Sequence, residues 1–274
     1  MKFNKKKIIS KINKFNINNK FNKNKFSNNK IKAPSNQNFF LWGKHALEAA
    51  IINKKRNFIK IYHTNEMSDW INEKLKNSNR NSEKLNEIEK KDLDDHALST
   101  PHQGVMAEVE PLIWLHLEDY VENNTDKMCL VLLDQLTNSQ NIGSILRTAS
   151  AFNVDGVVIT KNNTPMENGL MARAAAGAIE TMPLIRVTNL SRSIEYLKKN
   201  NFFVIGLEKH GKENISECVG NPQTALVLGS ENLGLRRLTK EKLSTSAKIP
   251  IAVQTESLNV SNATAIALYV IQNS

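Results

Sequence analysis

The stretch ALVLGSENLGLRRLT, residues 225–239, has two glycines five residues apart after an apolar run, as a phosphate-binding loop would. A P-loop needs Lys and then Ser or Thr directly after its second glycine, so that the amine reaches the phosphates and the hydroxyl reaches Mg²⁺. Here Leu235 and Arg236 follow Gly234, so nucleotide hydrolysis is not supported. A dinucleotide fingerprint also fails, because Glu231 stands where a second glycine must let a pyrophosphate approach the backbone. The loop therefore needs a different ligand.

Polar side chains follow predicted strands at three places in the chain. In the first, a helix begins near Asn141, which puts Arg147 in its second turn. The second is the loop with Glu231, and in the third Ser257 and Asn259 stand at the start of an apolar helix. Taken singly, each has a simple structural interpretation, since an Asn can cap a helix and an Arg can face solvent. No single loop therefore predicts a particular chemistry.

The elements that must position these loops alternate between short apolar strands and amphipathic helices. This alternation predicts an α/β fold, with a mainly parallel sheet covered by helices on both faces. In such sheets the ligand crevice lies beyond the carboxyl ends of the strands, where all three loops begin or end. The predicted strands are 129–134, 156–160, 183–187, 202–206, 225–229 and 248–252. The predicted helices are 141–152, 167–179, 189–199, 235–243 and 259–272.

A smaller α/β module precedes this region. Residues 40–51 are typical of a short strand that runs into a helix, and residues 57–64 of a second strand. A polar helix is predicted from Ser68 to about Lys91, and a last strand from Val105 to Val109. The predicted divisions are a tail at 1–38, a small N-terminal domain at 39–110, a linker at 111–126 and a main domain at 127–274.

The positive charge of the chain is concentrated in the tail. The net charge is +10, yet residues 1–43 hold 11 Lys and no Arg, Asp or Glu, which leaves 37 − 11 = 26 basic against 27 acidic residues elsewhere. A segment built mostly of Lys, Asn, Phe and Ile lacks the apolar variety for a core, so we predict that residues 1–38 are disordered. Three interpretations stay open: an RNA-binding arm, a transit peptide (disfavoured by the missing Arg and few Ser), or an unconstrained extension.

Composition excludes several classes of site. No apolar run approaches the length of a membrane span, so the protein is expected to be soluble, with no membrane partner. Cys129 and Cys218 are the only cysteines and stand far apart, which argues against a disulfide framework and a zinc site and favours a reducing, cytoplasmic compartment. The six histidines form no close pair with ligand spacing, so no metal is expected.

Together the three loops resemble the SpoU/TrmH-type RNA 2′-O-ribose methyltransferases of the SPOUT, or α/β-knot, superfamily. The motif Asn-x-Gly-x-x-x-Arg-(Thr/Ser)-Ala stands at 141–149, and Leu-Gly-x-Glu-x-x-Gly stands at 228–234. Ile-Pro-Ile and the following Ser-Leu-Asn-Val-Ser stand at 249–251 and 257–261. The order and spacing of all three agree, and the resemblance runs from about Leu41 to the C-terminus. Two departures are Asn138-Ser139, where relatives have Asp-Pro, and Asn262, where a small or apolar residue is usual.

The resemblance implies a fold and a cofactor. The main domain would carry a C-terminal trefoil knot, and the N-terminal domain would bind RNA. S-adenosylmethionine would bind in the knot, against Gly229, Ile249 and Leu258, without any metal. Family members work as homodimers, so a second copy of the chain is the expected protein partner.

The resemblance also implies roles for the polar residues. Arg147 would lie beside the target ribose; some accounts make it a base, but a guanidinium resists deprotonation, so we expect it to stay cationic. Asn141 would orient Arg147 or the ribose, and Glu231 would hold the loop and the arginine. Ser257 and Asn259 would shape the pocket and position the substrate.

Three functions stay open under the resemblance. Methylation of a guanosine in large-subunit ribosomal RNA is favoured by the appended N-terminal domain and the LRRLT sequence, and transfer RNA is the second candidate substrate. A catalytically silent RNA-binding assembly factor of the same fold would be expected to have lost polar residues of the motifs. The relevant set is intact: Asn141, Arg147, Glu231 and Asn259.

Overall fold

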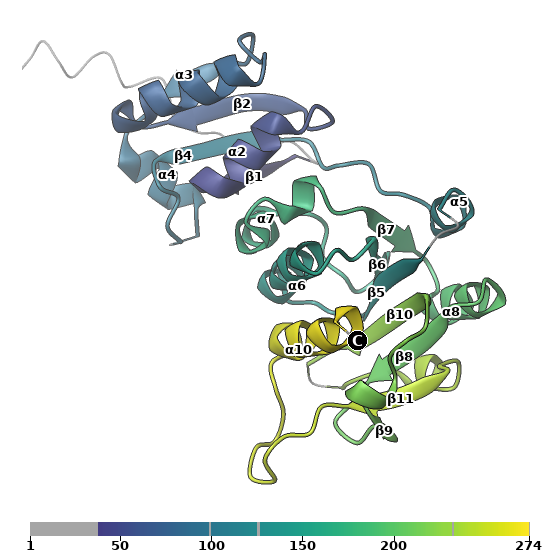
Figure 1. Cartoon of the computed structure of the whole chain (residues 1–274). Coiled ribbons are helices and arrows are strands. Elements are labelled where there is room, and N and C mark those ends of the chain that lie inside the picture. The colour runs from purple at the N-terminus through teal and green to yellow at the C-terminus, as the bar shows by residue number, and fades with distance from the viewer. Residues whose placement is uncertain (1–37, 99, 125–126, 232, 274) are drawn as a thin grey trace, which may run out of the picture.

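The computed structural model describes residues 38–98, 100–124, 127–231 and 233–273. The segment predicted to be disordered lies outside these residues, apart from Asn38. Two sheets follow one another along the chain, each with its own helices (Figure 1). In the described part of the chain, no helix is both long enough and apolar enough to cross a membrane.

The N-terminal sheet has its strands in the order β1-β4-β2-β3, and its two faces are covered by different helices. Leu41 of β1 points to the face covered by α2 and α3, whereas Trp42 points to the face covered by α4, as expected for alternating side chains. The strands are β1 (Phe39–Trp42), β2 (Phe58–His63), β3 (Leu85–Glu87) and β4 (Val105–Val109). The helices are α2 (Lys44–Ile52), η1 (Asn65–Met67), α3 (Ser68–Asn77) and α4 (Lys90–His96).

The predicted polar helix from Ser68 to about Lys91 is wrong in its second half. Helix α3 ends at Asn77, and Asn79 then adopts a left-handed backbone with φ of 52°. Asn is one of the few residues that takes this conformation readily, and it ends the helix. The chain then forms β3 beside β2, a pairing that periodicity in so polar a segment does not reveal.

The main sheet confirms the predicted α/β fold. Its seven described strands lie in the order β7-β6-β5-β10-β8-β11-β9, and every pairing between neighbours is parallel. In this order they are β7 (Leu184–Val187), β6 (Gly156–Thr160), β5 (Met128–Asp134), β10 (Gln223–Gly229), β8 (Phe203–Leu207), β11 (Thr245–Lys248) and β9 (Glu213–Asn214). The helices are α5 (Leu117–Glu122), α6 (Ser139–Ala151), α7 (Gly169–Ala175), α8 (Leu190–Lys199), α9 (Arg237–Lys240) and α10 (Val260–Gln272), with the short turns η2 (Ala178–Glu180) and η3 (Ile215–Glu217).

Helices cover both faces of this sheet, and alternate residues of each strand face opposite layers (Figure 1). Leu133 of β5 packs with α6, α7 and α10, whereas Leu132 packs with α5 and α8. This double burial explains why the strands are continuous apolar runs with no polar alternation.

The order in which strands are added to the sheet changes sides between β5 and β10. Strands β6 and β7 follow β5 on one side, and β8 then crosses to the other. In the parallel ladder Asp134 at the end of β5 is paired with Gly229 at the end of β10. A switch point of this kind leaves a crevice beyond the carboxyl ends of the two strands, and all three motif loops border it.

Three predicted boundaries in the main domain are wrong. The helix expected at 235–243 occupies only Arg237–Lys240. The helix expected at 167–179 breaks after Ala175, because Ala176 and Gly177 have φ of 49° and 94°. The strand expected at 248–252 ends at Lys248, where the proline at 250 has no N–H for a ladder bond and constrains the preceding residue. The strand instead occupies 245–248, with Thr245 paired to β8.

The two domains are packed tightly against each other. Buried Arg56 of the N-terminal domain contacts Glu167 and Glu180 of the main domain, with 2.7 Å between its Nη2 and a Glu180 carboxylate oxygen. A β-carbon on Gly169 of α7 would overlap the ring of Trp42 in β1. One hydrophobic cluster also continues from α2 into α7. The N-terminal domain is therefore held in one orientation against α7 and η2 of the main domain.

Candidate active site

The structure brings together one polar residue from each motif loop. The side-chain amide of Asn141 donates a hydrogen bond to the Glu231 carboxylate, and Asn259 donates to the Asn141 Oδ1 over 3.2 Å. These residues lie 90 and 118 positions apart in the sequence. Glu231, Asn141 and Asn259, which we call the polar chain, join the loop after β10 and the first turn of α6 to the N-cap of α10.

Asn141 can take part because a different residue caps its helix. Asn138 is the N-cap of α6, where its Oδ1 accepts from the backbone N–H of Gln140 over 2.9 Å and of Asn141 over 3.1 Å. The departure at Asn138 from the Asp-Pro of relatives is thus a well-formed cap. Asn259 combines both tasks, since its Oδ1 accepts from the N–H of Ser261 over 2.9 Å while its amide reaches Asn141.

Arg147 stands apart from the polar chain. It is exposed on α6, about 9 Å along the helix axis from Asn141 at 1.5 Å per residue. Among the described residues, none forms a hydrogen bond or an ion pair with its guanidinium. Glu231, which we expected to hold both its loop and this arginine, is bonded to Asn141 instead. The guanidinium is therefore available to a ligand.

The Glu231 loop folds back sharply on itself. The backbones of Ser230 and Gly234 exchange two hydrogen bonds, of 3.2 and 2.9 Å. A β-carbon on Gly229 would overlap the backbone of Gly234, so only glycine fits at this close approach. The glycine spacing thus serves a tight turn that presents backbone groups and Glu231.

A cavity of about 670 Å³ adjoins this loop. Six of the predicted site residues line it, whereas Asn141 and Arg147 do not. The six are Gly229, Glu231, Ile249, Ser257, Leu258 and Asn259. The cavity volume lies within the range of ordinary small-ligand sites, and its lining mixes aliphatic side chains with carboxylates and backbone groups.

A fourth wall of this cavity was not predicted from the sequence. Residues 207–210, at the end of β8 and directly after it, line it together with Lys240 of α9, and Glu208 forms an ion pair with that lysine. The signal was present, because these residues follow a predicted strand at the same carboxyl edge as the three motifs. The charges of Glu208 and Lys240 compensate each other in this ion pair. Of the other lining residues, Glu231 and Glu256 carry negative charge and Lys209 carries positive charge. The surplus of negative charge suits a ligand that carries positive charge.

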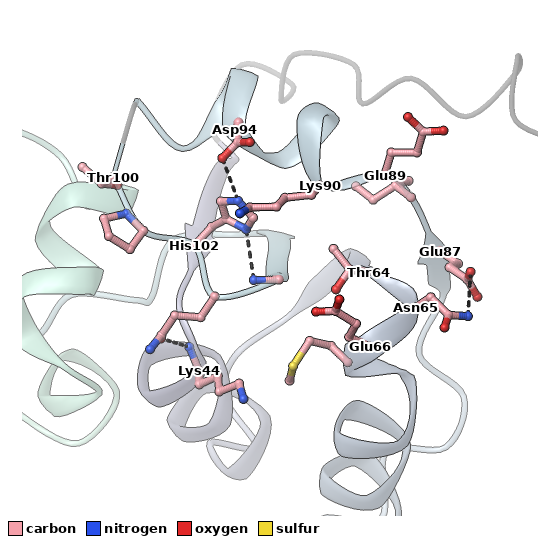
Figure 2. A pocket seen from close by; sticks show the side chains of 15 residues that line it. Lys44, Thr64, Asn65, Glu66, Glu87, Glu89, Lys90, Asp94, Thr100 and His102 are labelled. Atoms are coloured by element: carbon pink, nitrogen blue, oxygen red, sulfur yellow. Dashed lines mark hydrogen bonds and ion pairs between the residues drawn. The ribbon is translucent and has the colours of Figure 1, made fainter.

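A second cavity, of about 1010 Å³, lies in the N-terminal domain (Figure 2). It is bordered by the start of α2, by η1, by the β3–α4 connection and by the turn before β4, and no predicted site residue lines it. His102 is buried at its wall: its Nδ1 accepts from the Gly104 N–H over 3.0 Å, and its Nε2 lies 3.0 Å from Asp94. These bonds fix the tautomer, with the proton on Nε2.

Two protein-family models match successive parts of the chain. Residues 128–269 match the SpoU rRNA Methylase family, and residues 40–114 match the model for RNA 2′-O ribose methyltransferase substrate binding. The two matches correspond to the main sheet and to the N-terminal sheet.

Similar proteins cover nearly the same span. A protein of Staphylococcus aureus strain COL, described as a TrmH family tRNA/rRNA methyltransferase, is 35% identical over 230 residues, which is 83% of this chain and 92% of that protein. Among solved structures, the SpoU methyltransferase AviRb from Streptomyces viridochromogenes, crystallised with AdoMet, has a TM-score of 0.72 at 22% identity, over 85% of this chain and 88% of AviRb. An AdoMet-bound rRNA methyltransferase from Sinorhizobium meliloti gives 0.69 at 21% identity, over 85% and 86%. The solved structures thus share the fold of this chain.

Proposed function

Since the chain belongs to the SpoU rRNA Methylase family, we propose that it transfers the methyl group of S-adenosylmethionine to the 2′-hydroxyl of a ribose in RNA. It is an RNA methyltransferase with S-adenosylmethionine as cofactor, and the ribose oxygen as acceptor is our proposal. The observation that carries it is the meeting of Asn141, Glu231 and Asn259 beside the 670 Å³ cavity. The match of residues 40–114 to a 2′-O ribose methyltransferase substrate-binding model supports the choice of acceptor.

The cavity residues fit the cofactor. Ile249 and Leu258 offer aliphatic surface, and the cradle at Gly229 offers backbone groups that no side chain obstructs. The surplus of carboxylates suits a cofactor that carries a positively charged sulfur. When bound, S-adenosylmethionine supplies an already activated methyl group, so the reaction needs no metal.

The chain's own residues then have to align and activate a ribose hydroxyl, which is barely ionised at neutral pH. We propose that Arg147, exposed and without an internal partner among the described residues, fixes a substrate phosphate and stabilises the charge that develops on the ribose oxygen. The proton would leave to water or to phosphate, because a guanidinium is not deprotonated in proteins. Asn141 would hold the ribose, Glu231 and Asn259 would fix Asn141, and Ser257 would shape the pocket edge.

For the substrate we propose a guanosine of large-subunit ribosomal RNA, with transfer RNA as the alternative. RNA rather than DNA follows from the reaction, since only RNA offers a 2′-hydroxyl. The name of the S. aureus relative includes both transfer RNA and ribosomal RNA, so an experiment has to distinguish the two substrates. Lys44 and Lys90 at the rim of the N-terminal cavity are candidate phosphate contacts, held by the same domain that matches the substrate-binding model.

Other features implied by the resemblance belong to the same proposal. They are a trefoil knot in the C-terminal segment, a homodimer that completes each RNA site, and a cytoplasmic location. The division at 39–110, 111–126 and 127–274 also stays a prediction. The silent assembly factor is disfavoured by the intact polar chain, which binding alone would not require.

The test is to incubate the protein with labelled S-adenosylmethionine and separately with ribosomal and transfer RNA, and then to map methylated riboses. We expect label on one ribose of ribosomal RNA. A substrate with a 2′-deoxynucleotide at that position should accept no label. Label that persists on the deoxy substrate would show methylation of a base and would reject the 2′-oxygen as acceptor, whereas binding of RNA without transfer would support the silent factor.

A further inference from the structure

An ion pair beneath the site ties the Glu231 loop to the neighbouring strand. Asp134, the last residue of β5, has a fully buried side chain. Its Oδ1 accepts from the Arg236 Nε over 2.7 Å, and its Oδ2 accepts from the Arg236 backbone N–H over 3.1 Å. Among the described residues, all hydrogen bonds to this carboxylate come from Arg236. The two contacts together fix both the position and the direction of one residue.

The place of this pair in the sheet gives it a role. Asp134 is in register with Gly229, so it marks the point at which β10 ends and the loop begins. Arg236 stands two residues after Gly234, so it marks the point at which the loop ends. Between them the Ser230–Gly234 hydrogen bonds close the turn, and Glu231 projects from it to Asn141. The ion pair therefore clamps the base of the loop whose tip joins the polar chain.

Arginine fits this task better than any other cation. The planar guanidinium of an arginine donates along a fixed direction, while the backbone N–H of the same residue donates to the other oxygen of the carboxylate. The Arg236 side chain is 42% exposed, so the pair contributes little apolar burial to the core. The geometry fits orientation of the loop better than general stabilisation of the sheet.

We propose that Asp134 and Arg236 are positioning residues for methyl transfer, acting through the loop that carries Gly229 and Glu231. This inference rests on the proposed function for its catalytic part. It goes beyond the three motifs, since neither residue was predicted as part of the site or lines the cavity. Release of this pair would let the loop shift relative to β5, and Glu231 would lose its fixed approach to Asn141.

The variants to test are Arg236→Gln, Arg236→Lys and the double variant Asp134→Asn/Arg236→Gln, with Arg237→Gln as the matched control. Arg237 is the adjacent residue, carries the same charge and pairs with Glu241 on the surface, far more exposed at 79%. The double variant leaves no buried charge unpaired, so it separates loss of positioning from loss of folding. The measurements are S-adenosylmethionine affinity by calorimetry, kcat and RNA KM, and thermal unfolding.

We expect Arg236→Gln to lower kcat by about 100-fold, the effect of a displacement of about 1 Å at a reacting centre, and to weaken cofactor affinity by about tenfold. RNA KM should stay as in the wild type. Arg236→Lys should recover only part of kcat, since the ammonium restores charge without the fixed direction. The double variant should unfold like the wild type and still show the loss of kcat.

Other outcomes would overturn the inference. If Arg236→Gln and Arg237→Gln raise RNA KM equally and leave kcat unchanged, Arg236 serves only as surface charge. If Arg236→Lys or the double variant has wild-type kcat and cofactor affinity, the pair has no positioning role. A wild-type protein that methylates no RNA would reject the proposed function, yet the calorimetric comparison would still test the effect of the clamp on the cofactor loop.

Discussion

Arg147 is the residue on which the proposed chemistry depends most directly. Because its exposed guanidinium has no internal partner among the described residues, replacement by Ala should leave the free energy of unfolding within about 0.5 kcal/mol of the wild type. Loss of a group that stabilises developing charge should lower kcat by about 10²–10³-fold. Single-turnover methyl transfer measures the loss, and calorimetry should find S-adenosylmethionine affinity unchanged. Arg192→Ala, at an exposed position of α8, is the control, and a fall in cofactor affinity for Arg147→Ala would contradict the assigned role.

The importance of the hydrogen bond between Asn141 and Glu231 can be tested with two substitutions that change the charge of one partner. Glu231→Gln keeps an oxygen that can accept from Asn141, whereas Asn141→Asp sets a second carboxylate against Glu231. We expect Asn141→Asp to lower kcat by at least about tenfold more than Glu231→Gln, because a good donor is replaced by a repelling charge. Steady-state kinetics on the mapped RNA measures both. Equal losses in the two variants would show that the bond itself is not needed.

At the scale of single residues, the sequence predicted more of the residues that line the cavity than of the residues that hold them in place. Glu231, Ser257 and Asn259 line one cavity, as motif spacing on one sheet edge suggested. Asn138 as helix cap and the Asp134–Arg236 pair were not predicted, because each depends on side-chain directions that residue types alone do not fix. The wall at Glu208 was missed for a different reason: it carries no recognisable motif, although its position after a strand was itself a clue.

Among the elements, α6 carries both Asn141 and Arg147, and the packing of α6 against α7 fixes the positions of these two residues. A β-carbon on Gly143 would overlap the carbonyl oxygen of Met171, so the two helices can approach only at a glycine. We predict that Gly143→Ala destabilises the protein by about 1–3 kcal/mol, the usual cost of overpacking. It should also lower kcat, because the helix that presents both residues must move. Urea unfolding and steady-state rates measure the two effects, and Ser144→Ala on the same helix should change neither.

Elements were predicted where apolar periodicity was strong and missed where a single backbone conformation decided the outcome. The buried strands β5, β6 and β10 came out within one or two residues of their predicted bounds. The breaks after Asn77 and Ala175 depend on left-handed residues, one of which is an alanine with φ of 49°. Alanine has no local signal for that conformation, which is set by the packing around α7.

For the whole molecule, the junction between the domains fixes how the N-terminal domain is placed relative to the candidate site in the main domain. Arg56 is fully buried there between the carboxylates of Glu167 and Glu180, and its Nη1 also donates to the Glu110 carbonyl over 2.7 Å. Two carboxylates share one cation, so the cluster is short of positive charge. Burial raises the pKa of Glu167, with Arg56 opposing the shift. The folded state therefore binds a proton at Glu167 more readily than the unfolded chain does.

This shift predicts a pH dependence with a definite sign. A carboxyl whose folded pKa is raised stabilises the fold fully below its unfolded pKa of about 4.3, and this contribution is lost as pH rises through the folded value. The free energy of unfolding of the wild type minus that of Glu167→Gln should therefore be larger at pH 4.5 than at pH 7.5. Urea unfolding at both values measures it, with Glu118→Gln on the exposed side of α5 as the control for general acid effects. A difference that grows toward pH 7.5 would mean that Arg56 outweighs burial and holds Glu167 ionised, and the junction would then be strengthened rather than loosened as pH rises.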